Sequence, residues 1–338
     1  GLRRSFGDVH AVRDMTFVAR PGRVTALIGP NGAGKTTLLL MLATLLSPDA
    51  GSISVAGHDP VTDPAAVRRV MGWMPDVLGS WNTLSVRRAL ETTARLHGMS
   101  AEQASRRAGE LIALVSLEPI ASAQTRSLSR GQKQRLSLAR ALVHDPRVLL
   151  LDEPASGLDP AARVALRELV RGLAREGRTI LVASHVLAEL EVLAVDAVFV
   201  EAGATVSADR LARAARSSRS WRIRSIDAPD VLPRALAESA VPAAAVSSVG
   251  DSLLVSIESD EHAAALLAGL VSRGVRVTTF APAVGDFERT FLDLDRSPQP
   301  GGGGPSDPGR PSAGGPPPHE APSSPDDRAH DDGRTTSM

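Results

Sequence analysis

The sequence predicts an α/β fold in which helices cover a mostly parallel sheet, followed by a small α+β domain and a disordered tail. Over residues 1–207, short apolar β-like runs alternate with helix-like stretches. The composition then changes, and residues 208–296 carry a second set of strand-like and helix-like runs. In residues 297–338, Pro, Gly, Ser and Asp dominate and Ile, Leu, Val, Phe, Trp and Tyr are absent. This last segment cannot bury enough apolar surface to order.

The strands expected in the first region are short apolar runs bounded by turn residues. The clearest three are Val24–Gly29, Val148–Asp152 and Thr179–Ser184. A helix over Leu38–Leu46 should follow the first strand across a glycine-rich turn and stop near Pro48, because proline does not continue a helix. Further helices are expected at 84–98 and 101–116, with their arginines and glutamates on solvated faces. We therefore expect a helical subdomain at about residues 77–145.

The second region has the pattern of a small α+β domain. Three runs there are rich in β-branched and aromatic residues and read as strands: Trp221–Ile226, Ser252–Ile257 and Val275–Phe280. Helix-like segments lie between them at Asp230–Ser239 and Glu261–Arg273. The chain opens at Gly1 with its first domain already under way, which leaves room for an earlier opening strand.

Composition excludes several classes of function. The 38 basic and 38 acidic residues balance, so no overall field attracts nucleic acid. The absence of cysteine excludes disulfides and thiol catalysis and fits a reducing compartment. The longest uncharged apolar stretch, Thr36–Pro48, is shorter than the roughly 20 residues that a bilayer span needs, and no signal peptide is recognisable. We expect a soluble or peripheral protein without direct membrane insertion.

A glycine-rich turn carries the strongest chemical signal. It reads GPNGAGKTT, two glycines separated by four residues and followed by lysine and threonine. Glycines let backbone N–H groups turn toward phosphate oxygens, and the following helix adds the positive end of its dipole. Lys35, one of only two lysines, would neutralise the β- and γ-phosphates, and the Thr36 hydroxyl would ligate Mg²⁺. The nucleotide-binding residues expected here are Gly29, Pro30, Asn31, Gly32, Ala33, Gly34, Lys35, Thr36 and Thr37.

Two carboxylates follow an apolar strand. Val148–Leu151 is followed by Asp152 and Glu153, as expected for a buried strand that delivers two acids to a crevice. Asp152 would bind Mg²⁺ through a water, and Glu153 would accept a proton from an attacking water. Two acids after an apolar strand more often lie in solvent. Beside a phosphate loop, they indicate a catalytic site.

The segment SLSRGQKQR at Ser127–Arg135 precedes an apolar helix-like run. Ser129 and Gln132 have the spacing of a capping box, which by itself indicates only the start of a helix. Gly131 is unusual in a first turn because glycine lowers helix stability. Its small size leaves room for a phosphate at the helix N-terminus, so capping alone and phosphate binding are both open readings.

In order along the chain, five segments resemble the motifs of ABC ATPases over residues 1 to about 206. They are the Walker A loop GPNGAGKTT, the signature LSRGQ, the Walker B strand VLLLDEP, the D-loop ASGLD and the H-loop histidine in ASHVLAE. The resemblance implies a P-loop NTPase core that binds ATP and Mg²⁺. It also implies a head-to-tail homodimer, with ATP between the Walker loop of one subunit and the signature of the other.

Roles follow from this resemblance for individual residues. Ser129, Gly131 and Gln132 would contact the γ-phosphate of the partner's ATP, and Asp159 would organise the dimer seam. His185 would contact the γ-phosphate and the attacking water, although a histidine at a strand end is more often structural.

Two further positions are assigned by resemblance. Phe6, in RSFGD, matches the aromatic residue that stacks on adenine, with an ordinary core phenylalanine as the alternative. Asp76, in GWMPD, stands where the family's Q-loop has a glutamine. A carboxylate can still ligate Mg²⁺, but it adds charge and cannot donate a hydrogen bond, so turnover or coupling should be altered. At Arg130 glycine is commoner in the family, and this side chain is expected on the exposed side of the turn.

The function implied is that of an ATP-hydrolysing subunit of an ABC transporter. Residues 209–294, ending in GDFERTFLDL, resemble the small C-terminal domain of exporter ATPases with separate membrane subunits. The partner would be a permease, gripped by residues Met71 to about Gly98 at the cytoplasmic face of a bacterial membrane. The alternatives are a regulatory or weakly hydrolysing ABC module and a soluble ABC ATPase without a transport role.

Overall fold

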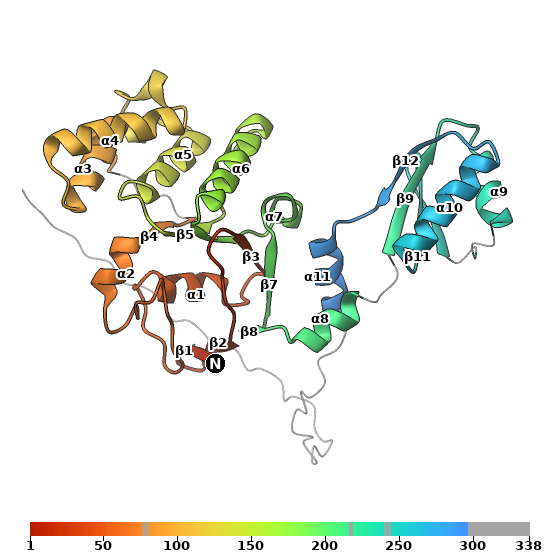
Figure 1. The fold of residues 1–338 in the computed structure, drawn as a ribbon, viewed down its shortest axis with the longest axis horizontal. Coiled ribbons are helices and arrows are strands. Elements are labelled where there is room, and N and C mark those ends of the chain that lie inside the picture. The colour runs from red at the N-terminus through yellow and green to blue at the C-terminus, as the bar shows by residue number, and fades with distance from the viewer. Residues whose placement is uncertain (77–78, 80, 216–218, 240–241, 243–244, 297–338) are drawn as a thin grey trace, which may run out of the picture. The chain divides into compact units, whose positions relative to one another are not determined.

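The fold is described from a computed structural model of the chain (Figure 1). The residues it describes are 1–76, 79, 81–215, 219–239, 242 and 245–296. The segment predicted as a disordered tail, 297–338, lies outside them. Within the described part of the chain, the strands form an eight-stranded sheet and a separate four-stranded sheet. The predicted fold class is confirmed.

The first sheet has the strand order β1-β2-β8-β7-β3-β6-β5-β4. Its strands are β1 (Leu2–Phe6), β2 (Val9–Met15), β3 (Val24–Ile28), β4 (Met71–Met74), β5 (Val148–Asp152), β6 (Thr179–Ala183), β7 (Asp196–Glu201) and β8 (Ala204–Thr205). The five strands from β7 to β4 pair in parallel. All five residues of β3 are buried, as expected for a strand covered on both faces.

The helices of the first region pack on this sheet or beside it (Figure 1). They are α1 (Lys35–Leu42), α2 (Pro64–Val70), α3 (Val86–Leu96), α4 (Ala101–Leu114), α5 (Arg130–Ala141), α6 (Pro160–Arg175), α7 (Leu187–Leu193) and α8 (Ala208–Ala215). Two short 3₁₀ turns, Glu118–Ile120 and Thr125–Ser127, lie between α4 and α5. Leu39 of α1 packs with Leu150 and Leu181 of the central strands, whereas α6 packs on the opposite side with Leu149 and Ile180.

Helix α1 differs from its prediction. It covers Lys35–Leu42 rather than 38–46, because it begins directly at the end of the glycine-rich turn. It ends before Pro48 since Thr44 has a left-handed backbone with φ of 63°. The apolar run that suggested a longer helix therefore continues through a turn.

The expected helical subdomain contains α3, α4 and α5, which lie together in Figure 1. Serine side chains cap all three helices, and those at Ser100 and Ser129 form full capping boxes with Gln103 and Gln132. Buried Leu90 and Leu111 belong to the core that these helices share with the first sheet. The subdomain and domain boundaries stay predictions.

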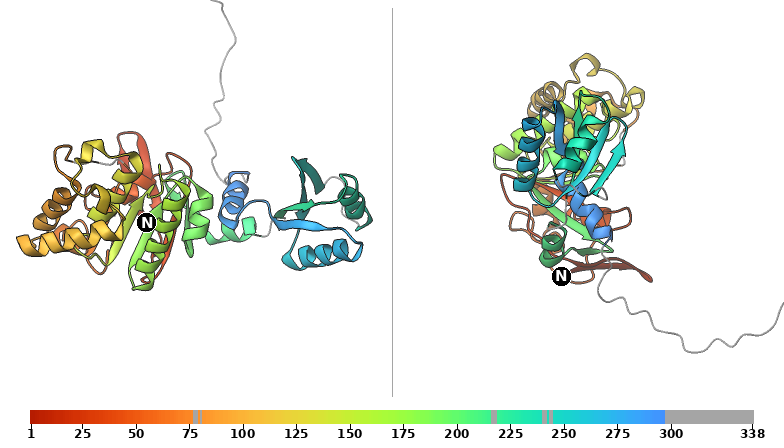
Figure 2. Two further views of the ribbon diagram at one scale, coloured as in Figure 1. Left: turned by 90° about the horizontal axis from the view of Figure 1, so that it is seen from above. Right: turned by 90° about the vertical axis from the view of Figure 1, so that its right-hand side faces the viewer.

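The second region folds as an antiparallel sheet of order β10-β11-β9-β12 with helices on one face (Figure 2). Its elements are β9 (Arg219–Ser225), α9 (Val231–Glu238), β10 (Val246–Val249), β11 (Ser252–Ile257), α10 (Asp260–Ser272) and β12 (Val277–Pro282). The helix that follows, α11 (Asp286–Arg296), packs instead with α7 and α8, and its Leu294 belongs to the core of the first sheet. Ile223 and Val255 of the sheet share one buried cluster with Leu236 of α9 and Leu270 of α10. Strand β10 and helix α11 were absent from the prediction. The sequence of β10, VSSV, has too few apolar residues to stand out.

Gly72 tests the packing of β4 against α5. A Cβ atom there would lie 2.1 Å from the carbonyl oxygen of Ala141, so Gly72→Ala must move the backbone and should lower the free energy of unfolding by about 1–3 kcal/mol. In contrast, Gly172 lies inside α6 with nothing within 4 Å of an added Cβ, so Gly172→Ala should raise the free energy of unfolding by about 0.5–1 kcal/mol. Urea denaturation measures both. Equal effects of the two variants would contradict the packing described here.

Candidate functional site

The glycine-rich turn connects the buried strand β3 to the N-terminus of α1. Gly32 and Gly34 have φ angles of 82° and 92°, in the region that glycine tolerates best. Gly34 is the N-cap residue of α1 and no side chain caps the helix. The first N–H groups of α1 therefore have no helical acceptor and are available to an anion.

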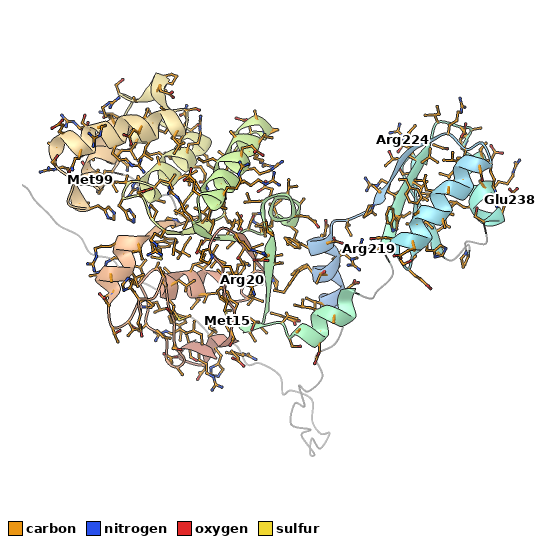
Figure 3. All side chains as sticks on the ribbon, viewed as in Figure 1. Met15, Arg20, Met99, Arg219, Arg224 and Glu238 are labelled. Atoms are coloured by element: carbon orange, nitrogen blue, oxygen red, sulfur yellow. The ribbon has the colours of Figure 1, made fainter. Side chains whose placement is uncertain are left out.

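Two of these glycines also allow close backbone contacts. A Cβ atom on Gly29 would lie 2.3 Å from the carbonyl oxygen of Val200 in β7. On Gly34 it would lie 2.3 Å from the carbonyl oxygen of Ala11 and 3.0 Å from the Cε of Met15, which Figure 3 labels at the end of β2. The glycine-rich turn thus packs closely against β7 and β2, and this close packing restricts the conformation of the turn.

Lys35 lies over this turn. Its Nζ donates to the carbonyl oxygens of Gly29 at 2.7 Å and Pro30 at 2.9 Å. Burial lowers the pKa of Lys35, while the negative charges of Glu153 and Asp152 act in the opposite direction. The Lys35 ammonium is therefore partly desolvated and near both acids. Its two carbonyl acceptors hold it beside the turn, where it could bind an anion.

Asp152 is the last residue of β5 and is buried, with 8% of its surface exposed. Burial, followed by the negative charges of Glu153 and Asp76, raises the pKa of Asp152 to about 6, and Lys35 opposes this shift. Asp76 contributes because β4 pairs in parallel with β5, with Met74 opposite Leu151, so both chains leave the sheet at the same edge. The structure thus brings together Lys35, Asp152, Glu153 and Asp76.

The Glu153 carboxylate is held by hydrogen bonds from the residues that follow β6. Its Oε2 accepts a hydrogen bond from the Ser184 hydroxyl at 2.9 Å, and its Oε1 accepts one from the His185 main-chain N–H at 2.7 Å. The Nδ1 of His185 also lies 2.8 Å from Oε1. Glu153 is a non-glycine residue with a left-handed φ of 50°. Its carboxylate therefore points toward the residues that follow β6.

His185 has a largely exposed ring, with 64% of its side chain accessible, although it contacts Glu153. It is therefore not a buried structural histidine. Its position directly after Ser184, at the end of β6, places it at the same sheet edge as the acids. The structure shows its contact with Glu153, while the role of His185 toward a γ-phosphate stays a prediction.

The signature segment forms the first turn of α5. Ser129 is the N-cap residue, and its Oγ accepts from the N–H of Gln132 at 3.3 Å. The Gln132 Oε1 in turn accepts from the N–H of Ser129 at 2.9 Å. The capping reading is therefore correct. The trans contacts expected for Ser129, Gly131 and Gln132 stay predictions, because they concern a second subunit.

The D-loop lies against the signature turn. Asp159 caps α6 by accepting from the N–H of Ala162 at 2.8 Å, and its predicted part in a dimer seam stays untested. The exposed side chain of Arg130, as predicted for this position, donates to the Oγ of Ser156 at 2.7 Å. A Cβ on Gly131 would lie 3.2 Å from the carbonyl oxygen of Gly157, so these segments are in contact.

Phe6 lies at the end of β1 with 48% of its surface exposed, so it is not a core residue. The guanidinium carbon of Arg4 lies 4.9 Å from the centre of its ring. An exposed aromatic ring is what stacking on a base requires. The adenine contact itself stays a prediction.

Sequence reasoning missed two residues that contact Glu153, namely Ser184 and Gln134. Gln134 has only 2% of its surface exposed, and its Nε2 donates to the main-chain oxygen of Glu153 at 2.7 Å. A polar residue in a polar stretch of α5 gives no signal of burial, whereas the position of Ser184 beside His185 could have drawn attention to it. No helix in the described part of the chain is both long and apolar enough to span a bilayer.

Comparisons with known proteins agree with these motifs. Residues 12–156 match the family model described as ABC transporter. A Nod factor export ATP-binding protein I of Burkholderia thailandensis is 36% identical over 269 residues, covering 79% of this chain and 88% of that protein. The protein of the same name from Burkholderia lata is 42% identical over 190 residues, covering 56% of this chain and 62% of its own length, which is less than two thirds. A solved ATP-binding subunit of an ABC transporter has a TM-score of 0.57 at 30% identity, covering 63% of this chain and 90% of that one.

The raised pKa of Asp152 predicts a pH-dependent stability. The pKa lies near 3.8 in an unfolded chain and at about 6 in the folded one, so the folded state binds this proton more tightly. Its carboxylate therefore destabilises the fold progressively as the pH rises from about 4 to 6, and fully above that range. Asp152→Asn should raise the free energy of unfolding by about 1–2 kcal/mol at about pH 8, after allowance for solvent screening, and by much less at about pH 4.

Urea denaturation in EDTA without nucleotide measures this difference. Asp8→Asn, at an exposed position in the turn between β1 and β2, serves as the control and should show no such pH-dependent gain. An equal effect of Asp152→Asn at both pH values would contradict the electrostatic description.

Proposed function

Because this chain belongs to the family of ABC transporter ATP-binding proteins, we propose that it binds ATP and hydrolyses it to drive transport through a membrane partner. The observation that supports this most directly is the edge of the first sheet. An uncapped helix N-terminus, the Lys35 ammonium and the carboxylates of Asp152 and Glu153 meet there. These are the groups that phosphoryl transfer to water requires.

The triphosphate would lie in the turn at residues 29–37, with the first N–H groups of α1 directed at its oxygens. Lys35 would exchange its two carbonyl acceptors for phosphate oxygens, which are stronger acceptors because they are charged. Phe6 offers an exposed ring for the base. The ring of Phe6 is thus accessible to the base, and the Lys35 ammonium can exchange its present acceptors for phosphate.

The residues present fit Mg²⁺, which prefers oxygen ligands and keeps several waters. Thr36 supplies a hydroxyl, and Asp152 and Asp76 supply carboxylates at one sheet edge. The described residues contain no group of three or more His, Asp or Glu side chains that could hold a metal ion. In this proposal, phosphate oxygens of the nucleotide would act as further ligands. When bound, the ion would stabilise the charge that develops on the phosphates.

Glu153 would act as the general base. Its carboxylate is ordered by the Ser184 hydroxyl and the His185 N–H, which limits the orientations from which it can accept a proton. An attacking water would transfer its proton to a Glu153 carboxylate oxygen as it approaches the γ-phosphate, and His185, on the same carboxylate, would orient that water. The exposed His185 ring allows it to reach the nucleotide.

We propose further that the active form is a head-to-tail homodimer on a separate permease at the cytoplasmic face of the membrane. The exposed N-terminal turn of α5, with Ser129, Gly131 and Gln132, would meet the ATP of the partner subunit, and Asp159 would lie at the seam. Residues Met71 to about Gly98 would bind the permease. Export is the favoured direction because the relatives named above are Nod factor export proteins.

A weakly hydrolysing regulatory module is a second candidate, and Asp76 is the observation in its favour. Its negative charge contributes to the raised pKa of Asp152, so a larger fraction of Asp152 would be protonated near neutral pH than with glutamine at position 76. A protonated carboxyl binds Mg²⁺ poorly. Turnover would then be slower near and below about pH 6, although nucleotide binding remains.

Glu153→Gln tests hydrolysis. Because an amide cannot accept the proton of the attacking water, kcat should fall by roughly 10²- to 10⁴-fold while ATP still binds. Phosphate release measures the rate, and size-exclusion chromatography with ATP should detect an accumulated dimer. Glu102→Gln, at an exposed site in the first turn of α4, should match the parent. A parent chain without ATPase activity above that of Glu153→Gln would rule out the enzymatic proposal.

Asp76→Gln tests the second candidate. Loss of this charge lowers the pKa of Asp152, so the acid limb of the pH–rate profile should move to lower pH. At about pH 6, where roughly half of Asp152 is protonated in the parent, kcat should rise up to about twofold, whereas at about pH 8 this shift should change it little. Loss of a carboxylate should also change the Mg²⁺ concentration at half-maximal rate. An unchanged rate together with unchanged Mg²⁺ dependence would show that Asp76 has no such effect.

A further inference from the structure

Gln134 is a buried polar residue that the mechanism above does not use. It lies in α5, in the second turn after the signature, and 2% of its surface is exposed. Its Nε2 donates to the main-chain oxygen of Glu153 at 2.7 Å. A buried amide that is bonded to the main chain of the proposed general base does more than fill space, because its hydrogen bond restrains that main chain.

The main chain at Glu153 needs such support. Its φ of 50° is a left-handed conformation, which costs a non-glycine residue energy and persists only where the surroundings determine it. The N–H of Glu153 donates to the oxygen of Ala183 at 2.8 Å, and its carbonyl oxygen also accepts from the N–H of Ser156 at 3.1 Å. Gln134 adds a side-chain hydrogen bond to that carbonyl from a different element, the signature helix.

The same helix contacts the segment after Glu153 at two more points. Arg130 donates to Ser156, and Gly131 packs against the main chain of Gly157. The contacts therefore run without a gap from the signature turn to the residue that bears the proposed base. A displacement of α5 would therefore change the hydrogen bond from the buried Gln134 amide to Glu153.

We propose that Gln134 is a positioning residue that links the signature helix to Glu153 and sets the orientation of its carboxylate for proton transfer. This inference rests on the proposed ATPase function and adds to it a connection within one subunit. Contact of the signature turn with nucleotide would be transmitted through α5 and the Gln134 amide to the main chain of Glu153. The amide itself does not touch the reacting atoms.

Gln134→Met tests the link, because methionine has a similar length and lacks the N–H donor. A small displacement of a reacting group lowers kcat strongly, so kcat should fall roughly tenfold to a hundredfold. The Kd for ATP should change less than about twofold, since the turn at residues 29–37 is untouched. Gln103→Met is the matched control: it removes a glutamine that caps α4 through Ser100 and has no hydrogen bond to Glu153, and it should retain kcat.

A double-mutant cycle separates positioning from a general structural effect. In the Glu153→Gln background the carboxylate that Gln134 orients is absent, so adding Gln134→Met should lower the residual rate less than about twofold. If Gln134→Met lowers the rate by the same factor in both backgrounds, the effect is structural and the inference is overturned. Where Gln134→Met does not fold, Gln134→Asn replaces it, with the amide retained but one methylene too short, and the same loss of kcat is expected.

The outcomes also distinguish the two proposals. A parent chain that hydrolyses ATP, with Gln134→Met and Gln134→Asn retaining its kcat, overturns this inference alone. A parent chain that does not hydrolyse ATP overturns the proposed function and this inference with it.

Discussion

Parallel pairing of the central strands is the constraint on which the site depends. Because β3, β4, β5 and β6 run in one direction, the segments that follow them leave the sheet at the same edge. Positions far apart in the sequence, such as Lys35 and Glu153, meet for this reason. A register shift between β5 and β6 would separate Glu153 from Ser184 and His185, because Asp152 lies opposite Ala183. Burial of the apolar strands fixes their register, and this register in turn determines where the polar residues that follow them lie.

That edge concentrates charge in a place with limited access to water. Burial lowers the pKa of Lys35 and raises that of Asp152, so each charged form is disfavoured by desolvation and favoured by the opposite charge nearby. The arrangement has an excess of acidic groups because Asp76 adds a further carboxylate. A site with this excess gains more from a bound cation than one with an amide at the same position.

The sequence was sufficient to predict the parts of the fold that have strong periodicity or strict chemistry. The bounds of β5 were correct, those of β3 and β6 were correct to within one residue, and the glycine-rich turn was identified from its spacing. The end of α1 was misplaced because Thr44 takes a left-handed backbone that no local residue pattern indicates. Strand β10 was missed because its serines resemble a loop, and only pairing with β11 stabilises it as a strand.

The candidate site was predictable where a residue lies within a motif and not where tertiary packing determines its environment. Ser129 and Gln132 were identified from their spacing. The structure adds that the side chain of each accepts a hydrogen bond from the main-chain N–H of the other. Gln134 could not be recognised because its burial depends on α5 meeting the end of β5, which involves residues distant in sequence. The left-handed backbone of Glu153 could not be predicted from the sequence either, since glutamate has no preference for that conformation.

The contact between Arg130 and Gly157 has a consequence for how this sequence can diverge. A Cβ on Gly157 would lie 2.6 Å from the Cδ of Arg130, and the φ of 74° at Gly157 already disfavours any larger residue. If glycine replaces Arg130, a Cβ at position 157 no longer overlaps with a side chain at position 130. If Arg130 is retained, a Cβ at position 157 overlaps with its Cδ. Because the φ of Gly157 by itself strains any residue with a Cβ, loss of the Arg130 side chain removes only one of two obstacles, and position 157 should stay glycine whichever residue stands at position 130.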